Sequence, residues 1–450
     1  MIIEPETEAL VKAYAAPVPR YTSYPTAPHF TSEIGADDYR GWLEAIPAGA
    51  RLSLYMHIPF CHSLCHYCGC NTKASRRYEP AAEYLSTLEA EITNVGALLP
   101  HAHLVSHMHW GGGSPNFLTP DDIRRLAAKA QSTYHFAPET EFAVELDPRF
   151  LTPEQVTAFH ESGVTRVSFG VQDFDDAVQV AINRLQSYEM TQACIAQCRD
   201  AGISSINVDL IYGLPEQTEA SIARTVEQVI SLSPDRIAIF GYAHLPARFK
   251  HQELINSDTL PGPVERFRQA RRAAAMLADA GYVAVGIDHF AKPEDDLGGA
   301  GVRRNFQGYT TDPSDLLIGL GASSIGQLPH GYVQNAVARG DYARRIAERG
   351  LATVRGKALT QDDRMRAHVI ERLMCDLTFN TCDLKRRFGA AAEPAIADAK
   401  LLVEADTDGI VERTPSGFRV TDYGRPFTRS VCSVFDRYLQ GGTAKHSSGV

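Results

Sequence analysis

Several features are missing from this 450-residue sequence, and each absence excludes a class of protein. No uninterrupted apolar run approaches the roughly 20 residues that a membrane-spanning helix needs. The first 20 residues are acidic at their start and lack the apolar stretch of a secretory signal, so we expect neither a signal nor a transit peptide. No tandem repeat or low-complexity segment is visible. The sequence therefore predicts a globular protein of the cytoplasm, with no membrane as its partner.

Positive charge is also scarce. The chain has 44 lysines and arginines against 54 aspartates and glutamates, for a formal net charge of -10. Proteins whose main partner is nucleic acid or an anionic membrane carry a basic surface, so this balance argues against both partners. An anionic substrate would have to be bound by local clusters of basic residues.

A disulfide framework is not expected either. The nine cysteines belong to a long chain of cytoplasmic character, in which thiols stay reduced and a large core needs no covalent cross-links. Five are scattered along the sequence, and two of these, Cys194 and Cys198, have the spacing of successive helical turns. We interpret that pair as buried small hydrophobic residues.

What the sequence does contain is a repeated alternation of strand, turn and helix over its first two thirds. Each β-rich run ends in a polar or glycine-rich turn, and most are followed by a stretch with apolar spacing of three and four residues. The runs cover residues 51–60, 104–113, 141–148, 166–174, 205–215 and 236–246, with 282–290 after them. "TPDD" and "TPEQ" are helix-start signals. The alternation predicts a parallel sheet with right-handed crossovers, as a barrel or as an open doubly wound sheet.

Polar residues stand where these predicted strands end. In parallel α/β folds the chemistry lies at the carboxyl ends of the strands, so this set predicts one site at the mouth of the sheet. Polar residues also end strands simply because solvent begins there, which leaves each one ambiguous when taken alone. The set comprises His57, Gly111 to Gly113, Glu145, Asp147, Gln172, Asp173, Asp209, Tyr212, Tyr242, His244, Asp288 and His289.

The stretch "YMHIPFCHSLCHYCGCN" places four cysteines within ten residues, directly after the first strand-like run. Thiolates are soft ligands that suit zinc or an iron–sulfur cluster. Structural zinc sites usually draw two ligand pairs from separated segments, and no second pair follows here. A compact loop wraps a cluster, whose irons lie at separate points, more easily than it converges on one ion. This spacing favours an iron–sulfur cluster, with zinc or an inert loop as alternatives.

The spacing C-x3-C-x2-C of Cys61, Cys65 and Cys68 resembles the signature of the radical S-adenosylmethionine superfamily. This resemblance implies that three thiolates hold a 4Fe–4S cluster whose fourth iron binds S-adenosylmethionine. It also implies that the "GGGSP" turn of residues 111–115 contacts the cofactor, since glycines allow close approach of the backbone to a ligand.

The chain further resembles the oxygen-independent coproporphyrinogen III oxidase family along nearly its whole length. The similar blocks are "PRYTSYPTA", "LYMHIPFCHSLCHYCGCN", "HWGGGSP", "VELDPR", "GVQDF", "NVDLIYGLP", "YAHLP", "DHFAKP" and "RNFQGYTT". The family's fourth cysteine, here Cys70, is present and is implied to lie near the cluster without being a ligand.

This resemblance implies a partial (β/α)6 TIM-like barrel with a smaller, mainly helical C-terminal domain. We expect residues 1–48 to form an extension on the barrel mouth, 49–357 the barrel core, and 358–450 a winged-helix-like domain. DNA binding does not follow from that domain, because the chain is acidic and such modules often only pack against others. We expect "GGTAKHSSGV" at the C-terminus to be a loose tail.

The family's cofactor-binding positions carry over to two molecules of S-adenosylmethionine. Those implied for the cluster-bound molecule are Tyr55, Gly112 and Glu145. Those implied for the second molecule are Tyr67, Gly113, Ser114, Gln172, Arg184, Asp209, Ala243 and Ile325. Tyr67 and Ser114 replace a phenylalanine and a threonine common in the family, which leaves fine geometry open.

The implied activity is the anaerobic conversion of two propionates of coproporphyrinogen III to vinyl groups. His57, Cys70, Phe306 and Gln307 are the implied catalytic residues, with His57 as an alternative support for the loop. The four carboxylates of the substrate need cations, for which Arg20, Arg303 and Arg304 are candidates. An unidentified electron donor and acceptor are implied, and we expect a monomer.

Two related activities compete with this prediction. A heme-binding, chaperone-like relative keeps the three-cysteine signature, but such relatives start close to the first strand and lack the extra cysteine. An anaerobic heme-degrading radical enzyme is similar in its first half and is expected to diverge around "RNFQGYTT". Cys70 and the "PRYTSYP" segment favour the oxidase.

Overall fold

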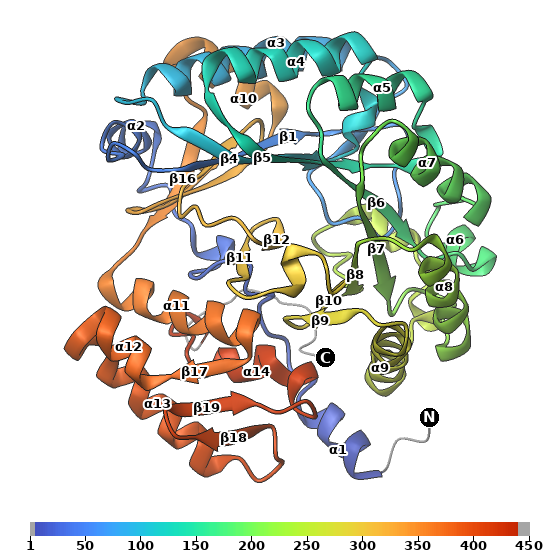
Figure 1. Ribbon diagram of the computed structural model, residues 1–450, viewed down its shortest axis with the longest axis vertical. Coiled ribbons are helices and arrows are strands. Elements are labelled where there is room, and N and C mark those ends of the chain that lie inside the picture. The colour runs from blue at the N-terminus through green and yellow to red at the C-terminus, as the bar shows by residue number, and fades with distance from the viewer. Residues whose placement is uncertain (1–4, 440–450) are drawn as a thin grey trace.

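The computed structural model describes residues 5–439, and its centre is a curved sheet of twelve strands (Figure 1). The strand order is β16-β15-β14-β13-β1-β4-β5-β6-β7-β8-β10-β9, and every pair from β13 to β8 is parallel. The parallel strands are β1 (Leu52–Ile58), β4 (Leu104–Gly112), β5 (His135–Leu146), β6 (Arg166–Gln172), β7 (Ser205–Tyr212), β8 (Arg236–Gly241) and β13 (Leu317–Leu320).

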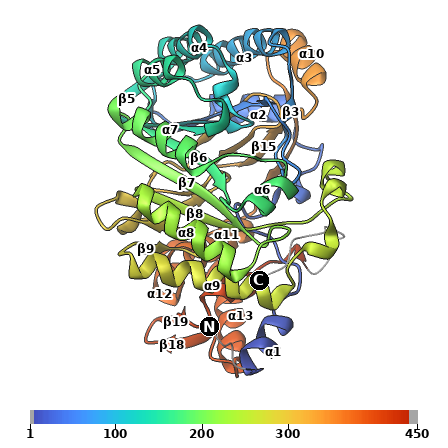
Figure 2. The same ribbon diagram turned by 90° about the vertical axis from the view of Figure 1, so that its right-hand side faces the viewer.

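Helices follow the strands and cover the outer face of the sheet (Figures 1 and 2). They are α3 (Glu79–Ala97), α4 (Pro120–Thr133), α5 (Pro153–Glu161), α6 (Asp176–Ala181), α7 (Tyr188–Asp200), α8 (Glu219–Leu232) and α9 (Pro263–Asp279). Thr119 and Thr152 accept hydrogen bonds from the third residue of α4 and α5, with proline next in sequence, as the two start signals predict. The six βα units confirm the partial (β/α)6 barrel.

The run at residues 282–290 is not one more parallel strand. It forms β9 (Val283–Val285) and β10 (His289–Ala291), an antiparallel pair in which β10 also pairs antiparallel with β8. Gly286, with φ +54°, makes the turn between them. The strand β13, which is four residues long and parallel to β1, was not predicted.

Antiparallel strands extend the other edge of the sheet, and a hairpin lies in the space that the sheet partly encloses (Figure 1). The edge strands are β14 (Ile325–Leu328), β15 (Gly331–Asn335) and β16 (Thr353–Ala358), and the hairpin is β11 (Arg303–Asn305) with β12 (Gly308–Thr310). Three more helices lie outside the βα units. They are α1 (Pro5–Ala13) and α2 (Ala36–Glu44), which precede β1, and α10 (Arg339–Arg349), which lies between β15 and β16.

The C-terminal region is mainly helical and carries a small antiparallel sheet of order β17-β19-β18. Its elements are α11 (Gln361–Asp376), β17 (Thr378–Asn380), α12 (Thr381–Phe388), α13 (Glu393–Ala405), β18 (Val411–Thr414), β19 (Gly417–Val420) and α14 (Thr428–Ser433). Leu10, Val11, Tyr21 and Tyr24 of the N-terminal segment are buried in its hydrophobic cluster, and Figure 2 shows α1 beside it. The tail expected at residues 441–450 lies outside the described residues.

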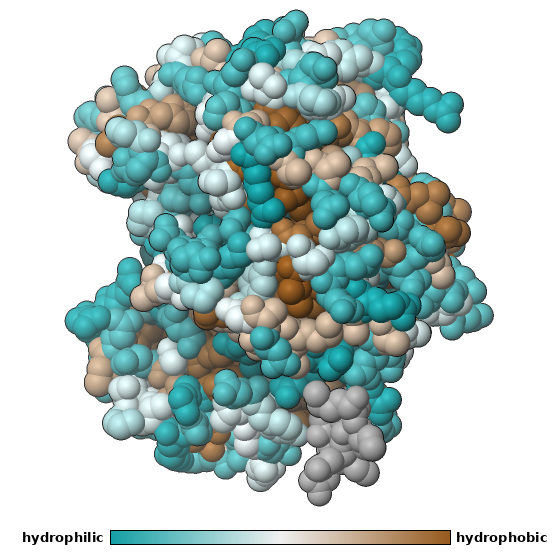
Figure 3. Space-filling model, turned by 45° about the vertical axis from the view of Figure 1, so that its right-hand side comes forward, coloured by the Kyte–Doolittle hydropathy of each residue, from teal (hydrophilic) through white to brown (hydrophobic). Residues whose placement is uncertain are grey.

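Between residues 5 and 439, no helix is both long enough and apolar enough to cross a membrane. Most of the visible surface is hydrophilic, and Figure 3 shows a recessed band of hydrophobic side chains running between hydrophilic ones on one face.

Candidate functional site

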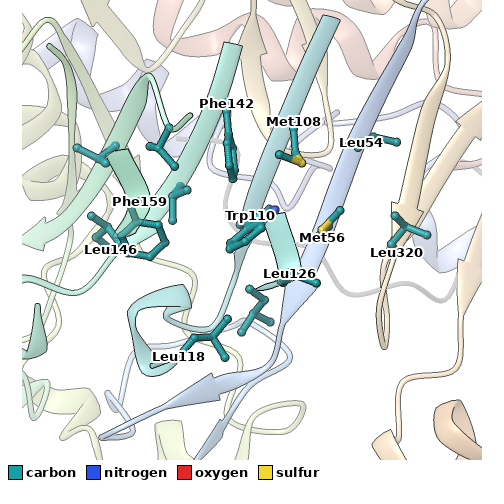
Figure 4. Close-up of a cluster of buried hydrophobic side chains, with 14 of the residues drawn as sticks. Leu54, Met56, Met108, Trp110, Leu118, Leu126, Phe142, Leu146, Phe159 and Leu320 are labelled. Carbon is teal, nitrogen blue, oxygen red and sulfur yellow. The ribbon is translucent and has the colours of Figure 1, made fainter. Parts of the chain in front are cut away.

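The alternation of side chains along β1 decides which residues reach the site. Leu54 and Met56 point into the core between sheet and helices, beside Met108 and Trp110 of β4 (Figure 4). Because successive side chains of a strand point to opposite faces, Tyr55 must project to the inner face of the sheet. The same alternation in β5 to β7 sends the apolar residues to the core and the polar ones inward.

Most of the predicted polar set lies at one mouth, at the carboxyl ends of the parallel strands, but Asp173 is buried beside α8, where it accepts a hydrogen bond from Thr225 at 2.6 Å. Several of its members interact electrostatically across the strands: Glu145 with Tyr55 and Asp209, and Asp209 with His289. The residues at or just after these ends are His57, Gly112, Gly113, Glu145, Asp147, Gln172, Asp209, Tyr212, Tyr242 and Ala243.

The cysteine loop leaves β1 and runs between two short paired strands, β2 (Phe60–Cys61) and β3 (Lys73–Ala74). All of its thiols are free, with Cys65 buried and Cys61 and Cys68 half-buried. In the part of the chain that the structure describes, no three Cys, His, Asp or Glu side chains converge as one metal ion would require. Three thiols on one short loop suit a cluster, whose irons lie at separate points, better than a single zinc ion.

Arginine donors at Cys65 and a lowered pKa at Cys68 favour metal binding, whereas burial raises the pKa of Cys61. The Cys65 Sγ accepts hydrogen bonds from Arg149 at 3.5 Å and from Arg184 at 3.4 Å. Contact with the neighbouring Cys70 thiol lowers the pKa of Cys68 to about 7. Cationic donors and lowered thiol pKa values are typical of metal-binding cysteines rather than of buried structural ones.

Cys70 is more exposed to solvent than the other three cysteines of the loop, but it faces the same site. It is exposed, its backbone N–H donates to the Cys68 Sγ at 3.4 Å, and it interacts electrostatically with Glu145. Hydrogen bonding to Cys68 raises the pKa of the Cys70 thiol, which keeps it protonated. Cys70 is thus a neutral thiol beside the three candidate ligands.

His57 holds the cysteine loop in place through a hydrogen bond. Its Nε2 donates to the Asn71 carbonyl oxygen at 2.8 Å, because a carbonyl only accepts. Burial lowers the pKa of His57, so the ring is neutral and its Nδ1 accepts from the Tyr55 hydroxyl at 3.0 Å. Both ring nitrogens are thereby engaged, which favours the loop-supporting role over direct chemistry.

The glycines at the end of β4 make room for other residues of the chain, whereas the resemblance implied that they make room for the cofactor. A Cβ on Gly111 would meet the Glu145 carboxylate at 2.6 Å, and one on Gly112 would meet His57 at 2.2 Å. A Cβ on Gly113 would lie 2.5 Å from the Phe60 carbonyl oxygen. Site residues of the chain itself fill these spaces, so the glycines are needed for packing within the site before any ligand binds. Ser114, next in the turn, donates to Cys61 Sγ at 3.7 Å.

Glu145 is prepared to act as an anion. Burial opposes its ionisation, but hydrogen bonds from His109 at 3.1 Å and from the Gly112 N–H at 3.0 Å outweigh this effect and lower its pKa. Its side chain remains 41% exposed. An ionised carboxylate that is fixed and still accessible can receive a ligand's ammonium or hydroxyl groups.

Arg184 is buried and already paired. It lies 3.3 Å from Asp147, which Arg149 also contacts at 2.7 Å. Gln172, at the end of β6, holds a left-handed backbone with φ +69°, a conformation that non-glycine residues adopt at a cost and often at functional sites. Asp209 accepts hydrogen bonds from Ser168 at 2.8 Å and from Asn207 at 2.9 Å.

One residue that joins two predicted positions escaped the sequence analysis. Gln252 is buried, and its amide donates to the Tyr67 carbonyl at 2.9 Å and the Ala243 carbonyl at 3.3 Å. The adjacent His251 bonds the Cys68 carbonyl at 2.6 Å. A short 3-10 helix, Lys250–Leu254, therefore fastens the cysteine loop to the end of β8. No motif marked it.

Three predicted residues come from the part of the chain that follows β10. Phe306 and Gln307 form the tip of the β11–β12 hairpin, where the Phe306 ring packs 5.6 Å from that of Tyr332. Ile325 starts β14, and its carbonyl would meet a Cβ on Gly319, which pairs with Tyr55. In the sheet, β13 therefore lies between Ile325 and β1.

The three arginines predicted to bind substrate carboxylates differ in how fully the protein already pairs them. Arg303 is paired with Asp315 at 2.6 Å and with Glu371 at 3.0 Å, so its charge is neutralised. Arg20 donates to the Gly241 carbonyl at 2.7 Å, at the end of β8. Arg304 lies over the Tyr309 ring at 4.3 Å and within 4.0 Å of Asp288.

Comparison with known proteins gives consistent matches. Residues 55–229 match the Radical SAM superfamily, and residues 359–427 match the HemN C-terminal domain. A protein of Bradyrhizobium diazoefficiens named oxygen-independent coproporphyrinogen III oxidase is 47% identical, covering 96% of this chain and 97% of its own. One of the same name from Paracoccus denitrificans is 42% identical, with 97% of each chain covered.

The solved structure of coproporphyrinogen III oxidase (HemN) from Escherichia coli, described as a radical SAM enzyme, superimposes with a TM-score of 0.89 at 38% identity. The match covers 96% of this chain and 98% of that one.

Proposed function

Because the chain belongs to the oxygen-independent coproporphyrinogen III oxidase family of radical S-adenosylmethionine enzymes, we propose that it converts coproporphyrinogen III to protoporphyrinogen IX in heme biosynthesis. Each of two propionate side chains loses carbon dioxide, one proton and two electrons and becomes a vinyl group. The observation that carries the proposal is the meeting of three loop thiols, the Gly112 turn and Glu145 at one mouth.

Cys61, Cys65 and Cys68 would hold a 4Fe–4S cluster, and Tyr55, Gly112 and Glu145 would contact the S-adenosylmethionine bound to it. When bound, these groups would supply a 5′-deoxyadenosyl radical able to abstract a hydrogen atom from the β-carbon of a propionate. The chain's own residues would orient the reactants: Glu145 would accept hydrogen bonds from the cofactor, and His57 holds the loop through Asn71.

The remaining assignments belong to the same proposal. A second S-adenosylmethionine would lie against Tyr67, Gly113, Ser114, Gln172, Arg184, Asp209, Ala243 and Ile325. The protein would work as a monomer in the cytoplasm, consistent with nine free thiols. An electron donor and an acceptor would complete the reaction.

The test is turnover by anaerobically reconstituted protein. With dithionite, S-adenosylmethionine and coproporphyrinogen III, we expect 5′-deoxyadenosine together with protoporphyrin. Tight heme binding with neither product would contradict the proposal and favour a heme-transferring relative. As a cheaper check, the purified protein should contain iron; one equivalent of zinc and no brown colour would rule the cluster out.

A further inference from the structure

Three buried charged residues lie against one thiol of the cysteine loop. The Arg149 Nη2 donates to the Cys65 Sγ at 3.5 Å, and the Arg184 Nη1 donates to the same sulfur at 3.4 Å. The Asp147 carboxylate accepts from both arginines, at 2.7 Å from Arg149 and 3.3 Å from Arg184. We call Asp147, Arg149 and Arg184 the charged triad.

The charged triad is shielded from solvent and carries one net positive charge. The exposed fraction of the side chain is 6% for Asp147, 8% for Arg149 and 7% for Arg184. Within residues 5–439, Asp147 is the only carboxylate within 4.0 Å of either guanidinium group. Burial raises the pKa of Asp147, but Arg184 and Arg149 outweigh this effect and keep the carboxyl ionised. Two protonated arginines and one carboxylate therefore leave a single positive charge, which little water screens.

Contacts within the chain fix both guanidinium groups at this position. Arg149 belongs to the 3-10 helix Pro148–Phe150 that directly follows β5, and its guanidinium lies over the Phe150 ring at 5.3 Å. The Arg184 Nε donates to the Gly170 carbonyl of β6 at 3.1 Å. The positive charge is thus set beside Cys65 by the ends of two neighbouring strands of the sheet.

The other two candidate ligands have uncharged hydrogen-bond partners. The Cys61 Sγ is hydrogen-bonded to hydroxyl groups, the nearer being that of Thr72 at 3.0 Å. The Cys68 Sγ accepts from the Cys70 N–H at 3.4 Å. In the part of the chain that the structure describes, Cys65 is therefore the only one of the three whose hydrogen-bond donors are charged.

Such a charge acts on the electron affinity of a cluster. A 4Fe–4S cluster gains one negative charge when it takes up one electron, and its reduction potential depends on nearby charge, on hydrogen bonds to its sulfurs and on solvent exposure. A fixed positive charge with N–H donors at a thiolate ligand stabilises the reduced form more than the oxidised form. Residues that only supported the loop would affect folding and iron content, but not this preference.

We propose that the charged triad raises the reduction potential of the cluster through Cys65, with Arg149 as the residue that adds the extra positive charge. Arg149 acts through a ligand and is therefore a positioning residue. This inference rests on the proposed function for the cluster held by Cys61, Cys65 and Cys68. It gives Arg149 a role that no sequence motif indicated, and it gives Arg184 a second role besides contact with S-adenosylmethionine.

A redox titration of the anaerobically reconstituted full-length protein measures this effect. Dithionite supplies the electron, and the electron paramagnetic resonance signal of the reduced cluster reports the potential, without S-adenosylmethionine. We expect Arg149→Gln to weaken one-electron reduction about tenfold, which lowers the potential by about 59 mV. Arg149→Lys keeps the charge and should stay closer to the wild type, whereas Asp147→Asn removes a negative charge and should raise the potential. Arg166→Gln is the matched control: its arginine is 15% exposed and paired with Glu141 at 2.7 Å, and the potential should not change.

Potentials are compared at equal iron content, so that loss of folding does not count as a shift. If Arg149→Gln takes up no cluster, Asp147→Asn decides: a raised potential supports the inference, and an unchanged one overturns it. Equal potentials in the wild type and Arg149→Gln, or loss of the cluster in all three triad variants, would show that these residues only support the loop and would overturn the inference. A lowered potential of Arg149→Gln in a protein that forms no protoporphyrin would uphold the effect of Arg149 and refute the proposed function.

Discussion

At the scale of single residues, the backbone conformation of Gly112 and its missing Cβ allow His57 to support the cysteine loop. Gly112 has φ +102°, and its missing Cβ makes room for the His57 ring, which in turn holds the cysteine loop. A substitution there combines backbone strain with a collision. Gly281 has a similar φ of +90° with open space around it, so the pair separates the two effects.

We predict that Gly112→Ala destabilises the protein by about 1–3 kcal/mol more than Gly281→Ala, since overpacking adds to a shared backbone cost. Urea unfolding of both variants measures the difference. Equal losses would mean that His57 moves aside without cost.

Cys70 gives a second prediction at this scale. Its thiol is kept protonated by Cys68, and it faces Glu145 without taking part in the three-cysteine spacing. Cys70→Ser should therefore keep iron content near that of the wild type while lowering protoporphyrin formation. Cys65→Ser is the comparison, because loss of a ligand should remove iron. Iron loss in Cys70→Ser would contradict the assignment of three ligands.

At the scale of elements, Glu91 ties helices to the edge of the sheet. This buried residue of α3 accepts hydrogen bonds from the Gly321 N–H at 2.6 Å, Asn335 of β15 at 2.6 Å and Tyr342 of α10 at 2.7 Å. Burial raises its pKa to about 7, despite these donors. The folded protein then holds a proton that the unfolded chain releases above pH about 4.5.

Because the folded state binds this proton more tightly, the stability that Glu91 contributes falls as the pH rises from about 4.5 to about 7. We expect the free energy of unfolding of the wild type, relative to Glu91→Gln, to drop by up to about 3 kcal/mol between pH 5 and pH 8. Urea unfolding at both pH values measures the change. If the difference in unfolding free energy between the wild type and Glu91→Gln is the same at both pH values, Glu91 is already ionised at pH 5.

At the scale of the whole molecule, the N-terminal segment holds the barrel and the C-terminal region together. Tyr21 donates to Asp436 at 3.1 Å, and the Tyr24 hydroxyl accepts from the Arg437 N–H at 3.0 Å. On the other side, Tyr332 donates to the Tyr24 carbonyl at 3.3 Å. One short segment thus contacts both parts.

Deleting residues 1–24 should expose the C-terminal region to proteolysis, because four apolar residues leave its cluster and each buried large side chain contributes about 1.5–3 kcal/mol. A shorter deletion that ends before Leu10 is the control. Limited proteolysis followed by mass spectrometry locates the cuts. Equal resistance of the two truncations would show that the C-terminal region is stable without this segment.

The sequence by itself determined the βα alternation, the helix starts at Thr119 and Thr152, and the three-cysteine spacing. These are local patterns, because the period of hydrophobic residues, capping and ligand spacing all act within a few positions of the chain. They also determined which residues of each strand face the mouth, since side chains alternate strictly.

The tertiary structure decided the contacts between distant segments. Arg20 and Gly241 lie 221 positions apart, and Gln252 reaches Tyr67 across 185. The spaces beside Gly111 to Gly113 are filled by groups from three other elements, and β14, which begins at Ile325, joins the sheet through β13, which pairs with β1. No local pattern encodes such meetings, because they depend on how the whole sheet curves and on which segments pack across its mouth.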